Sequence, residues 1–226
     1  MRRSFSRRRF LARSALGGAG MLFLRDSRLA LGAETNSRLR VALIGAGGRG
    51  TWFVDTIPRM EDVAAICDID DRRIAECFAR WADLAGKCAV SEHAWERNAA
   101  PAFRRLTEDN VKTFYDFRKM FDAMGAGLDA AIVSIPDHTH AVASAAAIRA
   151  GKHVFCEKPL TRTVQESRAL RDLARAQKVA TSMGNQGTAS GQFRRALELI
   201  RDGTVGAIRE VHVWNTDGGA DRKEPP

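Results

Sequence analysis

The chain has 226 residues, of which 45% are hydrophobic and 28% charged, a composition typical of a globular protein with one complete core. Its formal net charge of +9 would ordinarily suggest a nucleic-acid partner. However, residues 1–33 contain eight Arg and one Asp, whereas the rest of the chain holds 28 basic and 26 acidic residues. Because the basic excess lies mostly in this N-terminal tail, we expect a nearly neutral folded part that does not bind nucleic acid.

The four cysteines, at positions 67, 77, 88 and 156, do not form a recognisable ligand set. No Cys-x-x-Cys pair occurs, so a zinc site has no support. Cysteines this sparse in a chain of this size do not indicate a disulfide-stabilised fold. Cys67 and Cys156 lie in apolar, strand-like runs and are predicted to be small buried hydrophobic residues.

The N-terminal tail has the features of an export signal. A basic head precedes a weakly apolar run, Ser14–Leu24, whose 11 residues are about half of what a membrane span needs. The segment Ser6–Leu11 resembles the twin-arginine signal, with Arg7 and Arg8 at the paired positions. We expect residues 1–33 to be read by the twin-arginine export machinery, giving a periplasmic or exported protein without a permanent membrane span. The alternative is a disordered basic tail.

A glycine-rich turn follows the first strongly apolar segment of the remaining chain, Val41–Ile44. Its spacing, Gly-x-Gly-x-x-Gly, is typical of a loop that binds the pyrophosphate of a dinucleotide. The first glycine permits a tight turn, the second lets the backbone approach the phosphates, and the third lets the next helix pack closely. Such turns are common, so the motif also needs a preceding strand, a following helix and an acidic residue about 20 positions on. The candidate cofactor-binding residues in this loop are Gly45, Gly47, Gly48, Arg49 and Gly50.

An acidic residue stands at the required distance. The short apolar run Val63–Cys67 predicts a buried parallel strand, and Asp68 follows it, eighteen residues after the last glycine. A carboxylate there can accept hydrogen bonds from both hydroxyls of an adenosine ribose and repels a 2′-phosphate, which favours NAD over NADP. Arg72 and Arg73 weaken that preference, so NADP remains an alternative. The competing interpretation is that Asp68 caps the following helix, a role for which the next two aspartates are rivals.

Helix-like and strand-like segments then alternate, which predicts an α/β fold with a doubly wound parallel sheet. Residues 86–110 interrupt the alternation and are predicted to be an irregular, inserted surface segment without function, with a solvated His93. Apolar residues at helical spacing predict a core-facing helix at Ile74, Cys77, Phe78, Trp81 and Leu84. The predicted strands are 41–44, 63–67, 111–115, 129–135, 153–156 and 179–183, and the other predicted helices are 51–60, 116–124, 138–150 and 163–176, the last with a capping box.

In such a sheet ligands bind beyond the carboxyl ends of the strands, so the residues that follow each strand carry the chemistry. The histidines at positions 138 and 140 do not predict a metal site, because residues two apart in a helix face different directions and a third ligand is missing. Lys158 is the candidate catalytic residue, since its ammonium can donate to a substrate oxygen and lower the pKa of a hydroxyl that must lose its proton. The alternative is a surface lysine paired with a neighbouring carboxylate. The polar strand ends are Gly45–Gly50, Asp68, Pro136–His140, Glu157–Pro159 and Gly184–Gln186.

Taken in this order, these motifs resemble the Gfo/Idh/MocA family, the glucose–fructose oxidoreductase and inositol dehydrogenase group, over about residues 38–215. The resemblance implies a Rossmann domain and an NAD(P)-dependent oxidoreductase acting on a sugar, a cyclitol or a derivative. It places Lys158 near the nicotinamide and the substrate, Glu157 on the cofactor side, and a cis peptide before Pro159. Some exported relatives are instead glycosidases that use NAD, which is the alternative function. The implied cofactor-binding residues outside the glycine loop are Asp68, Pro136, His140, Glu157, Lys158 and Asn185.

The family resemblance also implies a second, α+β domain that supplies the substrate pocket and a general base. Only its start is expected here, as a helix at 192–201 and a strand at 207–214, so we expect a truncated chain that lacks the base. The expected domains are the signal at 1–33, the Rossmann domain at 38–186 and the incomplete domain at 187–226. A non-catalytic nucleotide-binding module is the remaining alternative, and a homo-oligomer is expected only with a complete second domain.

Overall fold

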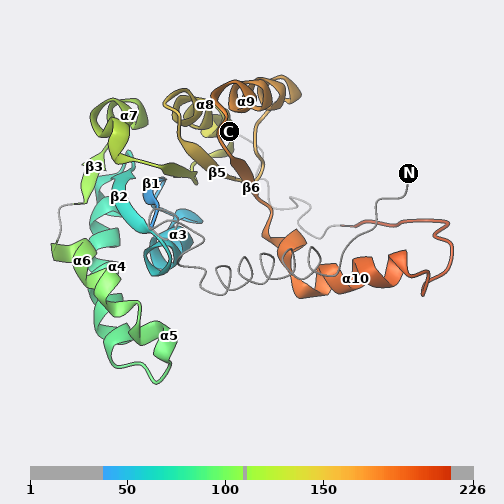
Figure 1. Cartoon of the computed structure of the whole chain (residues 1–226), viewed down its shortest axis with the longest axis horizontal. Helices are drawn as coiled ribbons and strands as arrows, with labels where there is room; N and C mark the ends of the chain where they lie inside the picture. Colours follow the sequence, from blue (N-terminus) through green and yellow to red (C-terminus); the bar gives the residue numbers. More distant parts are fainter. Residues whose placement is uncertain (1–37, 109–110, 215–226) are drawn as a thin grey trace, which may run out of the picture. The chain divides into compact units, whose positions relative to one another are not determined.

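The computed structural model describes residues 38–108 and 111–214, which belong to two compact units with their boundary between Gly184 and Asn185 (Figure 1). The predicted export signal and the final stretch, 215–226, lie outside the described residues. Among the described helices, none combines the length and the apolar character that a membrane crossing requires.

The first unit is built on a six-stranded sheet in the order β3-β2-β1-β4-β5-β6, with every neighbouring pair parallel. The chain moves outward from β1 to β3 and then returns to the other side of β1, so the strand order reverses between β1 and β4. The predicted doubly wound parallel sheet is therefore confirmed. The strands are β1 (Arg40–Ile44), β2 (Asp62–Cys67), β3 (Lys112–Phe114), β4 (Ala130–Val133), β5 (His153–Glu157) and β6 (Thr181–Gly184).

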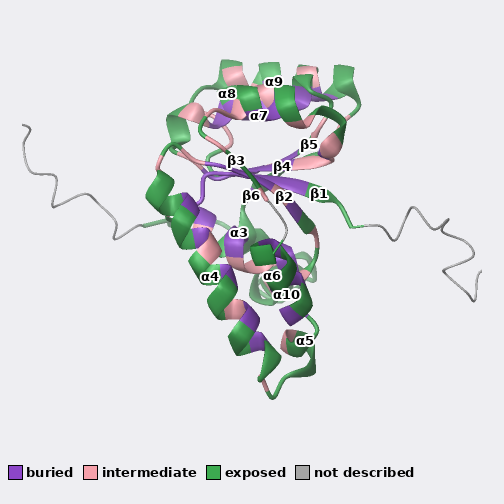
Figure 2. Ribbon diagram, turned by 90° about the vertical axis from the view of Figure 1, so that its left-hand side faces the viewer, coloured by how far each residue is buried: buried purple, intermediate pink, exposed green. Residues whose placement is uncertain are grey.

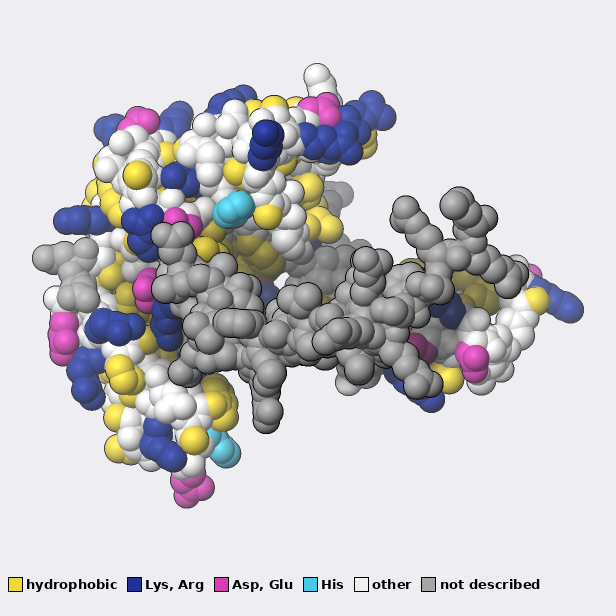
Figure 3. Space-filling model, viewed as in Figure 1, with side chains coloured by type: hydrophobic (Ala, Val, Ile, Leu, Met, Phe, Trp, Pro, Cys, Tyr) yellow, Lys and Arg dark blue, Asp and Glu magenta, His cyan; other side chains and the backbone are white. Residues whose placement is uncertain are grey.

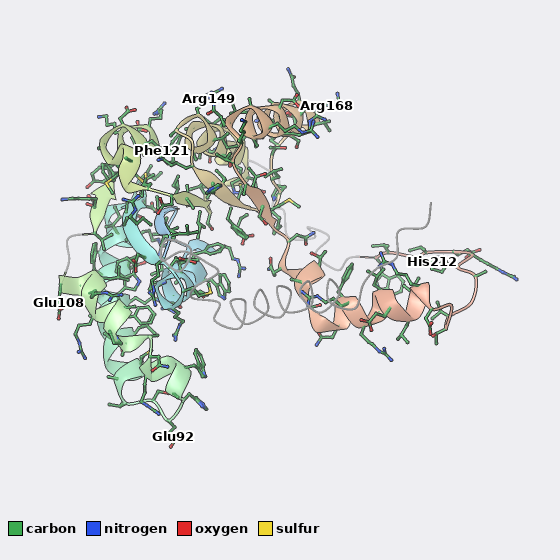
Figure 4. All side chains as sticks on the ribbon, viewed as in Figure 1. Glu92, Glu108, Phe121, Arg149, Arg168 and His212 are labelled. Carbon is green, nitrogen blue, oxygen red and sulfur yellow. The ribbon has the colours of Figure 1, made fainter. Side chains whose placement is uncertain are left out.

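Helices cover both faces of this sheet, and each face has its own apolar core (Figures 1 and 2). Trp81 and Phe103 are fully buried on one face, and Met120 and Ile148 on the other. The outer sides of the helices carry charged side chains (Figure 3), as Figure 4 shows for Arg149 and Arg168. The first face carries α3 (Gly50–Thr56), η2 (Ile57–Arg59), α4 (Asp71–Ala89), α5 (Ala94–Arg97) and α6 (Ala100–Glu108). The second carries α7 (Phe117–Met124), η3 (Gly125–Gly127), η4 (Asp137–Thr139), α8 (His140–Arg149) and α9 (Val164–Gln177).

The prediction of an irregular surface segment at 86–110 is wrong. The helix α4 continues to Ala89, and α6 then packs against it, burying Phe103 and Leu106 in the core. Pro101 is compatible with α6 because it lies in the first turn, where the missing N–H would have no intrahelical partner. His93 is exposed, as predicted.

Helix ends follow the expected side-chain chemistry. In α9 the Thr163 hydroxyl accepts from the N–H of Glu166, and the Glu166 carboxylate accepts from the N–H of Thr163, which confirms the predicted capping box. Asp70 caps α4 by accepting from the N–H of Arg72, and Asp116 caps α7 in the same way. These caps begin the helices directly after the polar strand ends.

The cysteines are free and buried. Burial raises the pKa of the Cys67 and Cys77 thiols to about 12 and that of Cys156 to about 11, with neighbouring carboxylates adding to the effect. These three thiols are therefore neutral, apolar core groups, as predicted for Cys67 and Cys156.

The second unit begins after β6 with η5 (Gln186–Ala189) and α10 (Gly191–Arg201), which Ser190 caps by accepting from the N–H of Phe193. Gly203 follows with a φ of +76°. The predicted strand at 207–214 is wrong, since this stretch is exposed and pairs with no segment among the described residues. Its alternation of apolar residues favours a strand, but a strand needs a neighbour to receive its backbone hydrogen bonds.

Candidate functional site

The glycine loop leaves β1 in a turn that only glycine can form. Gly45 has a φ of +90°, and a Cβ there would lie 2.1 Å from the carbonyl oxygen of Ser134, just beyond β4. A Cβ at Gly50 would lie 2.2 Å from the carbonyl oxygen of Gly45. The third glycine of the motif is therefore needed because the loop closes on itself at this point. These two glycines hold the shape of the loop at the position where the strand order reverses.

Between them, the loop presents free backbone donors. In the described chain, no acceptor is bonded to the backbone N–H of Gly47, Gly48 or Arg49. Gly48 has a φ of +52° and Arg49 is right-handed helical, a combination that turns successive N–H groups toward one point. This concave set of donors, exposed at Gly48 and Arg49, suits an anion such as a phosphate.

Asp68, at the end of β2, is bonded to this loop. Its Oδ2 accepts from the N–H of Ala46 at 2.8 Å, and its Oδ1 accepts from the N–H of Asp70 at 3.0 Å. The cap of α4 is Asp70, so the alternative interpretation of Asp68 as the helix cap does not hold. The carboxylate is half-buried beside the loop, where it joins the ends of β1 and β2.

The two arginines that follow are already paired with carboxylates. Arg72 donates to Asp70 through two nitrogens, at 3.0 and 2.8 Å, and Arg73 donates to Glu76 at 2.8 Å. The side chain of Arg73 nevertheless runs beside the glycine loop, since a Cβ at Gly47 would lie 3.2 Å from its Nε. This contact between Arg73 and the loop was not predicted from the sequence.

Across the sheet, an ion pair joins the loop to β5. The Nε of Arg49 donates to Oε1 of Glu157 at 3.0 Å, and Glu157 is only 5% exposed. The Arg49 guanidinium carbon also lies 4.6 Å from the centre of the Trp52 ring. A buried carboxylate requires a cation or several hydrogen bonds, so this pair brings Arg49 and Glu157 together from positions 108 residues apart.

Gly184 completes this arrangement; it belongs to a predicted polar strand end but is not among the predicted cofactor-binding residues. It pairs in register with Glu157, and a Cβ on it would lie 2.6 Å from the carboxyl carbon of Glu157. The sequence feature that could have identified Gly184 is its position as a glycine at the end of the next predicted strand after Glu-Lys-Pro. Its lack of a side chain provides the space that the carboxylate occupies.

We expect Gly184→Ala to lower the free energy of unfolding by about 1–2 kcal/mol, because the new methyl group would push the Glu157 carboxylate away from Arg49. Urea denaturation measures the change. Gly86→Ala is the matched control: it lies in α4 with nothing within 4 Å of a new Cβ and should raise stability by about 0.5–1 kcal/mol. Equal losses in both variants would contradict the packing of Glu157 on Gly184.

The ends of β4 and β5 carry the remaining predicted residues of the first unit. Pro136 and Lys158 are exposed, whereas His140 is buried with its ring between the carbonyl oxygens of Ile135 and Pro159. The peptide between Lys158 and Pro159 is cis, in agreement with the resemblance. Residues 38–108 and 111–214 contain no group of three His, Cys, Asp or Glu side chains that could hold a metal ion.

Unlike the other predicted site residues, Asn185 lies outside the first unit. It lies at the start of the second unit, where it precedes η5 and its carbonyl oxygen accepts from the Thr188 hydroxyl. A groove of about 480 Å³ lies elsewhere in the described residues, at the amino end of β2 beside Arg38 and Arg105. We locate the chemistry at the strand ends because the free N–H groups and the buried ion pair are there.

Two curated proteins are similar to this chain in sequence. A levoglucosan dehydrogenase from Pseudarthrobacter phenanthrenivorans is 30% identical over 128 residues, which is 56% of this chain and 32% of that protein. A glycosyl hydrolase family 109 protein from Stenotrophomonas maltophilia is 28% identical over 216 residues, which is 93% of this chain and 41% of that protein. The chain thus spans less than half of the length of either relative.

The fold is also that of known dehydrogenases. The crystal structure of scyllo-inositol dehydrogenase from Lactobacillus casei, with bound NAD(H) and scyllo-inositol, matches with a TM-score of 0.55 at 17% identity, over 75% of this chain and 43% of that chain. Residues 39–185 match the oxidoreductase family with an NAD-binding Rossmann fold, which is more than half of the chain. The chain belongs to this Gfo/Idh/MocA family of oxidoreductases.

Proposed function

We propose that this chain binds NAD at the carboxyl ends of β1, β2, β4 and β5, with the pyrophosphate on the free N–H groups of Gly47, Gly48 and Arg49. This donor set is the observation that carries the proposal, because it lies where the strand order reverses and suits an anion of that kind. Gly45 and Gly50 hold the turn, and Asp68 fixes the loop against β2.

The same residues favour NAD over NADP. The Asp68 carboxylate stands where the adenosine ribose would lie and would repel a 2′-phosphate. Arg72 and Arg73 could attract that phosphate, but their ion pairs with Asp70 and Glu76 would have to be given up. We therefore expect NAD to bind more tightly than NADP, and titration of both by calorimetry measures the difference.

For the reaction we propose hydride transfer between NAD and a sugar, a cyclitol or a derivative. Bound NAD would supply the hydride acceptor. Lys158 is exposed at the end of β5, and its ammonium can donate a hydrogen bond to the substrate oxygen. It would stabilise the negative charge that develops on this oxygen as the hydroxyl proton passes to water and the hydride passes from the carbon to NAD. Glu157, held by Arg49, keeps the start of this segment in place. The levoglucosan dehydrogenase relative supports this substrate class.

An NAD-dependent glycosidase is the second candidate, favoured by the family 109 relative that matches 93% of the chain. A nucleotide-binding module without catalysis is the third. Calorimetry with NAD tests the binding that all three share, and NADH absorbance with a panel of sugars and cyclitols tests the first. Release of nitrophenol from nitrophenyl glycosides in the presence of NAD identifies the second. Binding without either activity leaves the third, and no binding overturns the proposal.

We also propose export by the twin-arginine pathway, to the periplasm or beyond, because a paired-arginine motif precedes an apolar run. Changing Arg7→Lys together with Arg8→Lys should keep the protein in the cytoplasm, since the receptor reads the guanidinium pair and not the charge alone. Cell fractionation and immunoblotting measure the distribution. The matched control is Arg2→Lys with Arg3→Lys, which changes two arginines outside the motif and should leave export intact. Unchanged export of the Arg7 and Arg8 variant would contradict this route.

A further inference from the structure

His140 has surroundings that a neutral histidine does not satisfy. The side chain is 1% exposed, at the first position of α8. Its Nδ1 lies 2.6 Å from the carbonyl oxygen of Pro159, and its Nε2 lies 2.7 Å from the carbonyl oxygen of Ile135. Both ring nitrogens therefore face hydrogen-bond acceptors at short distances.

A carbonyl oxygen can only accept, whereas a neutral imidazole offers one donor and one acceptor nitrogen. With one proton on the ring, one nitrogen lone pair would point at a carbonyl lone pair in a site closed to water. Turning the ring by 180° exchanges nitrogens for carbons and would remove both hydrogen bonds. Only the imidazolium, with an N–H at each nitrogen, satisfies both carbonyl groups.

The two acceptors belong to different strand ends. Ile135 lies between β4 and the exposed Pro136, and Pro159 directly follows Lys158 at the end of β5. We propose that His140 is held as an imidazolium and that its two N–H groups set the spacing between the Pro136 segment and Lys158. His140 is then a positioning residue, which acts on cofactor and substrate through these two segments without contacting either. This role rests on the proposed function of Lys158, but the protonation state does not.

The charged and polar groups on the neighbouring elements are few. Asp137 and His138 precede α8 and are exposed, and Lys158 is exposed after β5. Glu157 is buried but already paired with Arg49, and the Cys156 thiol is neutral because burial raises its pKa to about 11. The charge on His140 is thus stabilised by the two hydrogen bonds to carbonyl oxygens, which must outweigh the loss of hydration and the positive end of the α8 dipole at this first helical position.

The first test is spectroscopic and needs no activity. In protein labelled with ¹⁵N-histidine, long-range ¹H–¹⁵N spectra at pH 7.5 should show both ring nitrogens of His140 with protonated-type shifts and slowly exchanging protons. The variant His140→Gln assigns the signals. If that variant does not fold, single Gln substitutions of the other four histidines assign His140 by elimination. One unprotonated ring nitrogen would overturn the proposal.

The second test measures positioning with NAD itself. His140→Gln can donate to only one of the two carbonyl groups, so we expect the Kd for NAD to rise about tenfold in calorimetry. His93→Gln is the matched control, because that exposed histidine lies beside α5, away from the strand ends, and should leave the Kd within about twofold. An unchanged Kd in His140→Gln would overturn the positioning role. Absence of NAD binding in the wild-type chain would instead refute the proposed function and leave the spectroscopic result standing.

Discussion

Gly47→Val should raise the Kd for NAD at least about 100-fold, a loss of roughly 3 kcal/mol, while the sheet stays folded. Gly47 is the second glycine of the motif, where a missing side chain lets a pyrophosphate approach the backbone, so the new side chain would obstruct that approach. Within the protein its Cβ would meet only the flexible side chain of Arg73, at 3.2 Å from Nε, which can move aside at little cost. Calorimetry measures the affinity, and thermal unfolding followed by circular dichroism checks the fold.

The matched control is Gly45→Ala, in the same loop. Its Cβ would lie 2.1 Å from a backbone oxygen of Ser134, at a φ of +90°, so this change should destabilise the protein by about 3 kcal/mol or more. Gly47→Val thus tests the binding of NAD, whereas Gly45→Ala tests the stability of the fold. NAD affinity that survives Gly47→Val would contradict the placement of the pyrophosphate.

Lys158→Met should lower kcat for sugar-dependent NAD reduction by about 10²- to 10⁴-fold while changing the Kd for NAD by no more than about threefold. Methionine keeps much of the length and apolar stem of lysine but removes the donor and the positive charge. The developing charge on the substrate oxygen then loses its stabilising partner. NADH absorbance under saturating NAD measures kcat, and calorimetry measures the Kd.

Lys152→Met is the matched control, because this lysine precedes β5 and so lies at the opposite end of the same strand. It should keep both kcat and the Kd near the wild-type values. If Lys158→Met retains full turnover, the lysine is a surface residue and the reaction depends on other groups. If Lys158→Met loses NAD binding instead, its main role is in cofactor binding.

The doubly wound sheet could be predicted because its information is local. Short apolar runs such as Val63–Cys67 alternate with helical stripes such as the one that contains Trp81, and the six runs predicted in the first unit all form parallel strands of one sheet. Turn and cap residues gave the same answer at Gly45 and at Thr163. Agreement between pattern, caps and turns is what makes such a fold readable from one sequence.

The errors arose where the local pattern was weak or incomplete. In α6, Phe103 and Leu106 are spaced as a helical stripe, but the surrounding charges and Pro101 obscured it. At 207–214 the pattern suits a strand, yet pairing depends on a neighbour that the stretch itself cannot specify. In both cases, whether the segment forms a helix or a strand depends on its tertiary neighbours and not on the local sequence alone.

In the site, the loop glycines could be predicted, but their partners could not. The bond from Ala46 to Asp68 and the ion pair between Arg49 and Glu157 depend on which strands lie side by side and in what register. His140 is buried and its neighbour His138 is exposed, and this difference depends on the position of Pro159, whose carbonyl oxygen contacts the ring of His140. No spacing rule within a single chain segment contains this information.

The most direct test of NAD binding at the glycine loop is an NAD titration followed in ¹H–¹⁵N spectra of the wild-type chain. We expect the amide signals of Gly47, Gly48 and Arg49 to shift together, and further than those at the amino ends of the strands, because their free N–H groups receive the pyrophosphate. Saturable NAD binding that leaves these three amides unmoved, or that shifts signals only around Arg38 and Arg105 at the amino end of β2, would contradict this expectation.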